Sequence, residues 1–234
     1  MKENRWDDFL GSKITPNREI EGGNVHLSYK GSEIFVEGTM SCIVGQAKSR
    51  KTFALSLLLE QLLKPSIEGM ESSFIGDILY FDTEMSPLRV QNVSKRFTRP
   101  ENMNIFSIRQ YSIKERYELI EESIKRLRPH IVVIDGFKEL TQDINDQVYS
   151  TKLTNKILQW TSEYDTHITG ILHTNPESSK PRGALGTEIV NKSSLVLHCQ
   201  AKGPSSRLTT LFSRDKEVDP ITFRIDEKGN PVVR

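Results

Sequence analysis

Apolar runs alternate with amphipathic segments along most of the chain beyond residue 40. Short apolar runs occur at 75–82, 104–108 and 131–135, and each is followed by a segment with helical spacing, from residue 86, at 114–128 and at 149–164. In the last two segments apolar side chains recur every three or four residues, which is the spacing of one buried helix face. The pattern is typical of β-α-β units. It predicts an α/β fold with a mainly parallel, twisted sheet flanked by helices.

The character of the chain changes beyond residue 165. Apolar runs at 168–173, 194–199, 208–213 and 221–225 are joined by shorter connections, so we expect antiparallel strands in the C-terminal part of the sheet. Residues 1–38 are polar apart from two short runs, at 25–29 and 34–36, which are too small to fold alone. We expect a single domain overall, with an N-terminal arm or short antiparallel ribbon at 1–38 that packs on a core at 39–234 and extends its sheet.

Composition narrows the class of protein. The 234 residues are 36% hydrophobic and 27% charged, which suits one well-packed domain, and the net charge of +1 means that nucleic-acid binding needs a local basic surface. No apolar window has the length of a membrane span, and the first residues lack the apolar core of a signal peptide, so we expect a cytoplasmic protein without a membrane partner. Cys42 and Cys199 lie in strand-like runs, as reduced core thiols do.

The clearest chemical signal lies between an apolar run at 41–44 and a leucine-rich stretch at 53–63. It fits the phosphate-binding loop pattern G-x-x-x-x-G-K-[ST] at seven of eight positions, with the residues Gly45, Gln46, Ala47, Lys48, Ser49, Arg50, Lys51 and Thr52. In such a loop, backbone N–H groups at a helix N-terminus cradle phosphates, the lysine reaches the terminal phosphates and the hydroxyl holds Mg²⁺. Arg50 stands where the second glycine belongs, so its side chain must turn away from the phosphates. A plain turn between strand and helix is the alternative.

Two carboxylates follow strand-like runs. Asp135 ends the run at 131–134, so we expect it at the carboxyl edge of the sheet, where it would hold Mg²⁺ through bound water; the alternative is a surface aspartate that caps the next turn. Glu84 follows the run at 78–82 and is the candidate that orients or deprotonates the attacking water. Asp82 is its rival, and either carboxylate could instead cap the helix that starts near Ser86.

His173 ends the run at 168–172, where it could contact the γ-phosphate. The segment at 174–187 contains Lys180, Arg182, two prolines and two glycines, and it predicts a mobile loop. A phosphate-sensing residue joined to such a loop would act as a switch.

The order of these motifs resembles the RecA-like P-loop superfamily, and within it the ring helicases of the DnaB, RepA and KaiC group. The resemblance covers roughly residues 20–226, and the loop variant from Ala47 to Thr52 looks like that of ATPases encoded by plasmids and mobilizable transposons. The resemblance implies ATP and Mg²⁺, with Lys51 on the phosphates, Thr52 and Asp135 at the metal, Glu84 as catalytic glutamate and His173 as the polar sensor.

The resemblance also implies assembly and a DNA substrate. In ring members a basic pair on a late strand completes the neighbouring subunit's site. Arg214 and Lys216, two apart and expected to share one strand face, match it, although a solvated edge is the alternative. Lys180 and Arg182 would contact single-stranded DNA in a central channel, with a solvated loop as the alternative. The implied assembly is a homo-oligomer, which could be a hexameric ring. A primase or a relaxase would be a further partner.

The sequence therefore predicts a RecA-like motor that binds and hydrolyses ATP and acts on single-stranded DNA in replication or mobilisation of a mobile genetic element, with helicase activity as one form of that work. One alternative is a nucleotide-gated switch that controls assembly or a protein partner with little ATP turnover. Another is a small-molecule kinase in which the segment at 174–187 is a lid.

Overall fold

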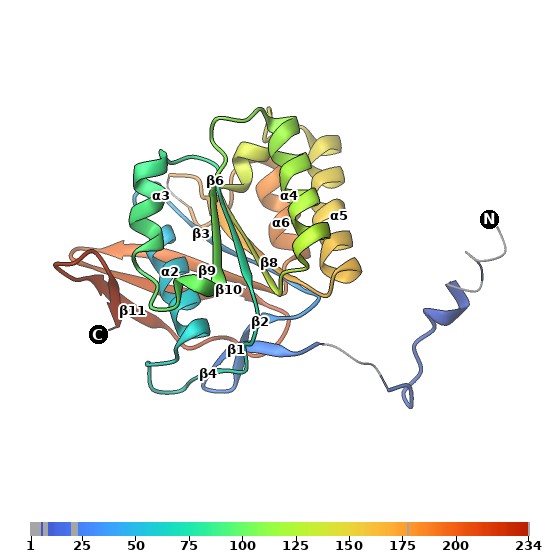
Figure 1. Ribbon diagram of the computed structural model, residues 1–234, viewed down its shortest axis with the longest axis horizontal. Helices are drawn as coiled ribbons and strands as arrows, with labels where there is room; N and C mark the ends of the chain where they lie inside the picture. Colours follow the sequence, from blue (N-terminus) through green and yellow to red (C-terminus); the bar gives the residue numbers. More distant parts are fainter. Residues whose placement is uncertain (1–5, 7–8, 20–22, 177, 234) are drawn as a thin grey trace.

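The fold is described from a computed structural model, which covers residues 6, 9–19, 23–176 and 178–233 (Figure 1). Its centre is a nine-stranded sheet made of β3 (Met40–Gly45), β5 (Ile78–Asp82), β6 (Met103–Ser107), β7 (Ile131–Asp135), β8 (His167–His173), β9 (Leu195–Lys202), β10 (Ser205–Ser213), β11 (Ile221–Ile225) and β12 (Pro231–Val233). The strand order is β12-β11-β10-β9-β3-β8-β7-β5-β6.

The strands from β9 to β6 in that order run parallel, whereas β10, β11 and β12 add antiparallel pairs at the other side. The predicted α/β class, with a mainly parallel sheet and antiparallel C-terminal strands, is confirmed. The parallel strands β3, β5 and β7 are buried on both faces, which explains why their sequences are almost continuously apolar.

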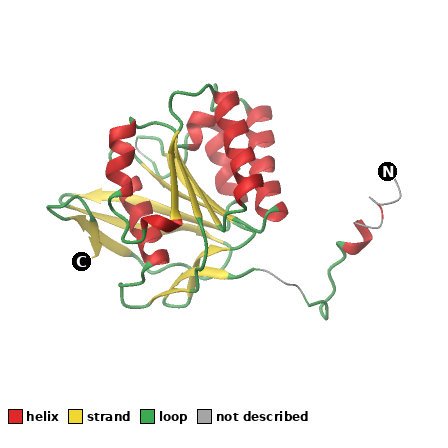
Figure 2. Cartoon of the chain, viewed as in Figure 1, coloured by secondary structure: helices red, strands yellow, loops and turns green. Residues whose placement is uncertain are grey.

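Helices cover both faces of the sheet (Figure 2). One face packs against α2 (Lys51–Leu63) and α3 (Pro87–Ser94), and the other against α4 (Ile113–Leu127), α5 (Gln147–Glu163) and α6 (Gly183–Lys192). Alternation along β3 divides the core: Ile43 belongs to the cluster with α2, while Cys42 and Val44 belong to the cluster with the other three helices. Both cysteines are buried and unbridged, as expected.

Local signals fix several helix ends. Ser112 and Glu115 form a capping box at the start of α4, and Arg128 ends that helix in the left-handed conformation just before Pro129. Asp146 accepts the Tyr149 N–H at the start of α5. Short 3₁₀ turns, η1 (Pro100–Asn102) and η2 (Phe137–Leu140), precede β6 and follow β7.

The N-terminal strands form a sheet of their own. β1 (Val25–Tyr29) pairs antiparallel with β2 (Ser32–Val36), so the expected ribbon is present. The expectation that it extends the main sheet is wrong, because the other edge of β1 pairs with β4 (Met70–Ser72), a strand that the sequence pattern did not predict. The small sheet packs Leu27 and Phe35 into the cluster around α2. Residues 1–5, 7–8 and 20–22 of the expected arm lie outside the described residues.

Two further boundaries differ from the prediction. The strand expected at 75–82 begins only at Ile78, and the loop expected at 174–187 is shorter because α6 begins at Gly183. Gly186 lies inside that helix, where a Cβ would come within 2.7 Å of the Pro181 ring, so this glycine serves close packing rather than loop mobility. Among the described residues, no helix is long and apolar enough to cross a membrane.

Candidate functional site: a phosphate-loop cleft

The predicted phosphate loop connects the carboxyl end of β3 to the N-terminus of α2. The loop leaves the strand at Gly45 and enters the helix at Lys51, as the motif requires. A Cβ on Gly45 would lie 2.4 Å from the Cys199 carbonyl oxygen and 2.7 Å from the Ser49 Oγ, so only glycine fits where the loop starts. The first N–H groups of a helix have no partner within it, and the loop leads directly into the start of α2, which is the arrangement that binds anions.

Arg50 occupies a conformation that normally belongs to glycine. Its φ is 70° and its ψ is 33°, in the left-handed region. Its guanidinium is directed toward the β9–β10 hairpin, where Nη1 donates to the Ser205 carbonyl at 2.8 Å and to the Ser206 Oγ at 3.1 Å, and Nη2 donates to the Gly203 carbonyl at 3.1 Å. The side chain is thus turned aside in the way that loop closure requires.

Lys51 and His173 meet at the centre of the loop. The buried Lys51 Nζ donates to the carbonyls of Gly45 at 3.0 Å and Gln46 at 2.7 Å, and it lies 3.4 Å from the His173 Nδ1. Burial and the nearby charges of Lys51 and Arg182 lower the His173 pKa to about 4. The imidazole is therefore neutral at pH 7, and its Nδ1 accepts a hydrogen bond from the ammonium.

Asp135 lies at the end of β7, close to Thr52 in the first turn of α2. It is buried, and its Oδ2 accepts a 2.5 Å hydrogen bond from the Tyr80 hydroxyl. Burial raises the Asp135 pKa to about 7, although the hydroxyls of Tyr80 and Thr52 oppose that shift. The alternative of a surface cap is wrong, because Asp135 is buried and the N-cap of η2 is Gly136, with no side-chain cap.

Thr52 and Asp135 fit a magnesium ion rather than a metal held by the protein alone. Among the described residues, no group of three or more His, Cys, Asp or Glu side chains is arranged to hold a metal. A hydroxyl beside a single carboxylate suits Mg²⁺, which keeps several waters and takes further oxygen ligands from substrate phosphates. These two residues would hold the ion there.

The two rival carboxylates after β5 have different surroundings. Asp82 accepts the backbone N–H groups of Glu84 at 3.0 Å and Met85 at 2.6 Å through Oδ1, so it shapes the turn that leads into α3. Glu84 is open to solvent at the mouth of the cleft, where desolvation by the cleft walls, followed by the charges of Glu139 and Asp82, raises its pKa. A Cβ on Gly136 would lie 3.1 Å from the Glu84 Oε1, so the glycine makes room for this carboxylate.

One cavity of about 340 Å³ is lined by Lys51, Thr52, Glu84, Asp135 and His173. Its wall also contains residues that the sequence analysis missed, among them Phe53, Arg89, Asn92 and Arg96. Arg89 and Asn92 lie three residues apart in α3, a helical spacing that was present in the sequence, whereas Arg96 follows the end of that helix. The Arg96 guanidinium stacks 3.8 Å from the Phe53 ring centroid and donates to the Ser56 Oγ at 3.1 Å.

The basic loop after β8 is tied to the phosphate loop. The Gln46 side chain donates to the Pro176 carbonyl, and the Thr174 N–H donates to the Gly45 carbonyl at 3.1 Å. Arg182 precedes α6 and its Nε donates to the Thr174 carbonyl at 3.0 Å, whereas Lys180 is exposed. Arg182 thus lies close enough to lower the pKa of Lys51 and His173.

Arg214 and Lys216 do not share a strand face, so this expectation is wrong. β10 ends at Ser213 and the chain bends there. Arg214 donates to the carbonyls of Ser193 at 3.3 Å and Asn191 at 3.2 Å, while the Lys216 Nζ donates to the Lys30 carbonyl at 3.1 Å.

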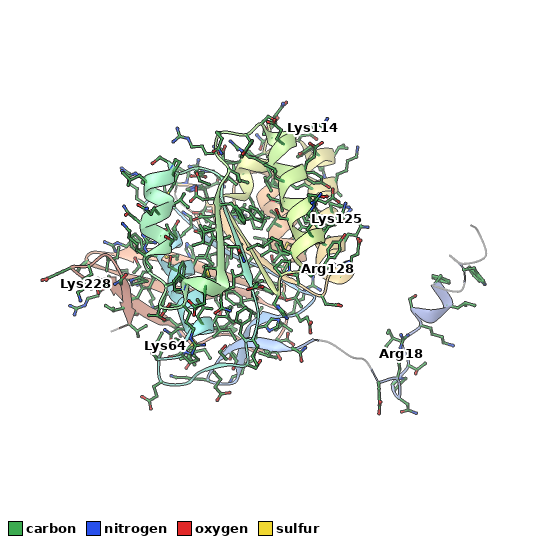
Figure 3. The ribbon with its side chains drawn as sticks, viewed as in Figure 1. Arg18, Lys64, Lys114, Lys125, Arg128 and Lys228 are labelled. Carbon is green, nitrogen blue, oxygen red and sulfur yellow. The ribbon has the colours of Figure 1, made fainter. Side chains whose placement is uncertain are left out.

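The position of Arg214 and Lys216 also excludes a role in their own chain's cleft. Ser213 pairs with Leu195, which pairs with Ser41 near the start of β3. The two basic residues therefore lie near the amino ends of the parallel strands, whereas Gly45 lies at the carboxyl end of β3. Other basic side chains are spread over the periphery: Lys114, Lys125 and Arg128 point outward from the region of α4, and Lys64 from the far end of α2 (Figure 3).

A scan against protein-family models finds no match to this chain, and a search of curated proteins finds no relative. A functional proposal therefore rests on the geometry of the cleft together with the order of motifs in the sequence.

Proposed function

We propose that this protein is a RecA-like P-loop ATPase, a motor that acts on single-stranded DNA in replication or mobilisation of a mobile genetic element. One observation carries the proposal: Lys51, Thr52, Glu84 and Asp135 come from three separate segments and line a single cleft at the N-terminus of α2. A cation, a hydroxyl and two carboxylates are the groups that phosphoryl transfer to water requires.

Each residue has a distinct task in this proposal. The Lys51 ammonium, now bonded to loop carbonyls, would exchange them for phosphate oxygens. Thr52 and Asp135 would hold Mg²⁺, which neutralises charge on the phosphates when bound. Glu84 would orient the attacking water and accept its proton, and its raised pKa brings its basicity closer to neutral pH.

His173 would couple the cleft to the basic loop. Its ring contacts Lys51, and its backbone carbonyl accepts the Arg182 N–H at 3.0 Å. When Lys51 moves onto the phosphates, His173 loses its donor and can accept a new partner. Lys180 and Arg182, in the adjoining loop, are the residues through which DNA would sense that change.

The test is an ATPase assay with and without single-stranded DNA across a range of protein concentrations. We expect hydrolysis that DNA stimulates and that Lys51→Ala reduces by two orders of magnitude or more, a loss of about 3 kcal/mol of transition-state stabilisation. Lys64→Ala, at the other end of the same helix, is the matched control and should leave the rate unchanged. Tight ATP binding that is indifferent to DNA, with negligible turnover, would favour the nucleotide-gated switch. Absence of ATP binding would reject the proposal.

A further inference from the structure

We infer that Arg50 is a positioning residue that makes the β9–β10 hairpin part of the nucleotide site. The inference rests on the proposed function, because it concerns the same phosphate loop. In the usual motif a glycine permits the left-handed conformation from which the helix starts, whereas here the contacts of the guanidinium with the hairpin hold residue 50 in that conformation.

The first observation is the backbone of residue 50. A φ of 70° disfavours any residue with a Cβ, and Arg50 is the residue immediately before Lys51 and Thr52. A change of conformation here would displace both phosphate- and metal-binding side chains. An arginine can persist at this position only if contacts made by its side chain or its neighbours offset the strain.

The second observation is the set of contacts that supply this offset. The Arg50 guanidinium bridges the turn of the hairpin and the start of β10, since it donates to the carbonyls of Gly203 and Ser205 and also to the Ser206 Oγ. The planar, forked guanidinium can reach these acceptors together, whereas a lysine ammonium is a single point donor. These contacts therefore require an arginine, and another basic side chain could not replace it.

The preceding loop residue is held by the same hairpin. The Ser49 carbonyl accepts hydrogen bonds from the Cys199 Sγ at 3.0 Å and from the Ser206 Oγ at 3.4 Å. Ser206 is fully buried and bonds both Ser49 and Arg50, so it joins the two consecutive loop residues to β10. The phosphate loop and the hairpin thus form one hydrogen-bonded unit.

This unit has a thermodynamic consequence. If the hairpin holds the loop in its nucleotide-binding conformation, nucleotide binding must in turn hold the hairpin, because coupling between two sites is reciprocal. The turn at residues 203–204 is exposed, so a partner that binds the turn would change nucleotide affinity without touching the cleft.

The test compares the Mg²⁺–ATP affinity of variants by calorimetry, using a slowly hydrolysed analogue. We expect Arg50→Gly to bind at least tenfold more weakly with no fall in melting temperature, since glycine relieves the backbone strain but lacks the contacts. Arg50→Lys should bind weakly too. Ser206→Ala should weaken binding less in the Arg50→Gly background than in the parent, because only the Ser206–Ser49 hydrogen bond is then left to lose. Arg207→Ala, an exposed arginine on the same hairpin, is the control and should bind as the parent does.

A second readout is amide hydrogen exchange at residues 203–206. The nucleotide should slow exchange there in the parent and in Arg207→Ala, and not in Arg50→Gly. This inference alone would be overturned if Arg50→Gly bound the analogue as tightly as the parent or more tightly, or if the nucleotide slowed hairpin exchange in Arg50→Gly as much as it does in the parent. Failure of the parent to bind the analogue would overturn it together with the proposed function, so the two failures are distinguishable.

Discussion

The Tyr80 hydroxyl donates a 2.5 Å hydrogen bond to the Asp135 carboxylate, across the neighbouring strands β5 and β7. Burial nevertheless dominates and raises the Asp135 pKa from its ordinary value of 3.8 to about 7. The folded protein therefore binds this proton more tightly than the unfolded chain does. The resulting stabilisation is fully present below about pH 3.8 and is lost as the pH rises through about 7. An ionised Asp135 is thus kept at the expense of folding stability.

Asp135→Asn should remove the stability cost of the ionised carboxylate and, with it, the activity. The amide carries no charge to desolvate, so we expect the variant to be more stable than the parent at pH 8, by about 1–3 kcal/mol, while ATP hydrolysis is largely lost. At pH 5 the parent carboxyl is protonated in the folded state, so the advantage should be smaller than at pH 8, and it should disappear only below about pH 3.8. Thermal unfolding at both pH values measures the difference. A variant that is less stable than the parent at pH 8 would contradict the account.

Tyr80→Phe should move the pH dependence of hydrolysis. The lost hydrogen bond stabilised the ionised form of Asp135, so its removal raises the pKa of that carboxyl further. Magnesium must compete with the proton for this group, so the acid limb of kcat/KM should shift to higher pH, by up to about one unit. Tyr149→Phe is the control, because the Tyr149 hydroxyl donates to the Leu140 carbonyl instead. If the pH profile of kcat/KM does not shift, Asp135 does not take part in metal binding.

Gly136→Ala should impair catalysis while sparing ATP affinity. The new Cβ would lie 2.5 Å from the Thr83 Oγ1 and 3.1 Å from the Glu84 Oε1, so Glu84 must move. Its φ of 108° adds a backbone cost of about 1–3 kcal/mol. Gly229→Ala is a matched control with a φ of 84° and nothing within 4 Å of the added atom. We expect both variants to lose stability in unfolding experiments but only Gly136→Ala to lose turnover; a parallel loss of turnover in both would remove the steric explanation.

Glu84 and Asp82 can be distinguished by replacing each with its amide. Glu84→Gln removes the proposed base, so turnover should fall by about 10²–10⁴-fold with ATP binding retained. Asp82→Asn keeps an oxygen that can accept the N–H groups of Glu84 and Met85, and its effect on turnover should be within about tenfold. Single-turnover hydrolysis and equilibrium binding measure the two quantities. The reverse order of effects would make Asp82 the base.

Periodicity predicted the helices and parallel strands because each of them buries a regular face. The run at 131–135 became β7, and the helical spacing at 114–128 and 149–164 became α4 and α5 within about two residues. The short elements failed for the opposite reason. β4 is three residues long and owes its existence to pairing with β1, a contact distant in sequence.

The sequence predicted that Lys51, Thr52, Asp135 and Glu84 lie near the carboxyl ends of the parallel strands, and they do. The prediction was possible because each residue comes at or soon after the end of an apolar run. The sequence could not predict which side chains form hydrogen bonds with these residues and with Arg50. The Tyr80 hydrogen bond and the docking of Arg50 on the hairpin depend on strand order, and β9 and β10 lie more than 140 residues beyond the loop. The strand assignment of Arg214 and Lys216 failed because alternating charges persist through a bend as readily as along a strand.

The remaining role of Arg214 can be decided by mixing inactive chains. Arg214 lies at the sheet edge opposite its own phosphate loop, so it can reach a nucleotide only in a neighbouring subunit. Arg214→Ala should then lower turnover at least tenfold while ATP affinity is kept. Arg224→Ala, an exposed arginine on β11, is the control. Since Arg214 also bonds carbonyls at the end of α6, the melting temperature of the variant must be checked beside its rate.

Mixing Arg214→Ala with Lys51→Ala chains in equal amounts gives a stronger result than either variant alone. A productive interface needs an intact Lys51 in one subunit and an intact Arg214 in the next, so random assembly should restore about a quarter of the parent rate. A residue that acts within its own chain restores nothing, because neither chain then contains a complete site. Light scattering should confirm that the two chains assemble together. If the chains assemble together and no hydrolysis is recovered, Arg214 only caps the end of α6. Any group that a neighbouring subunit contributes to the site would then be a different residue.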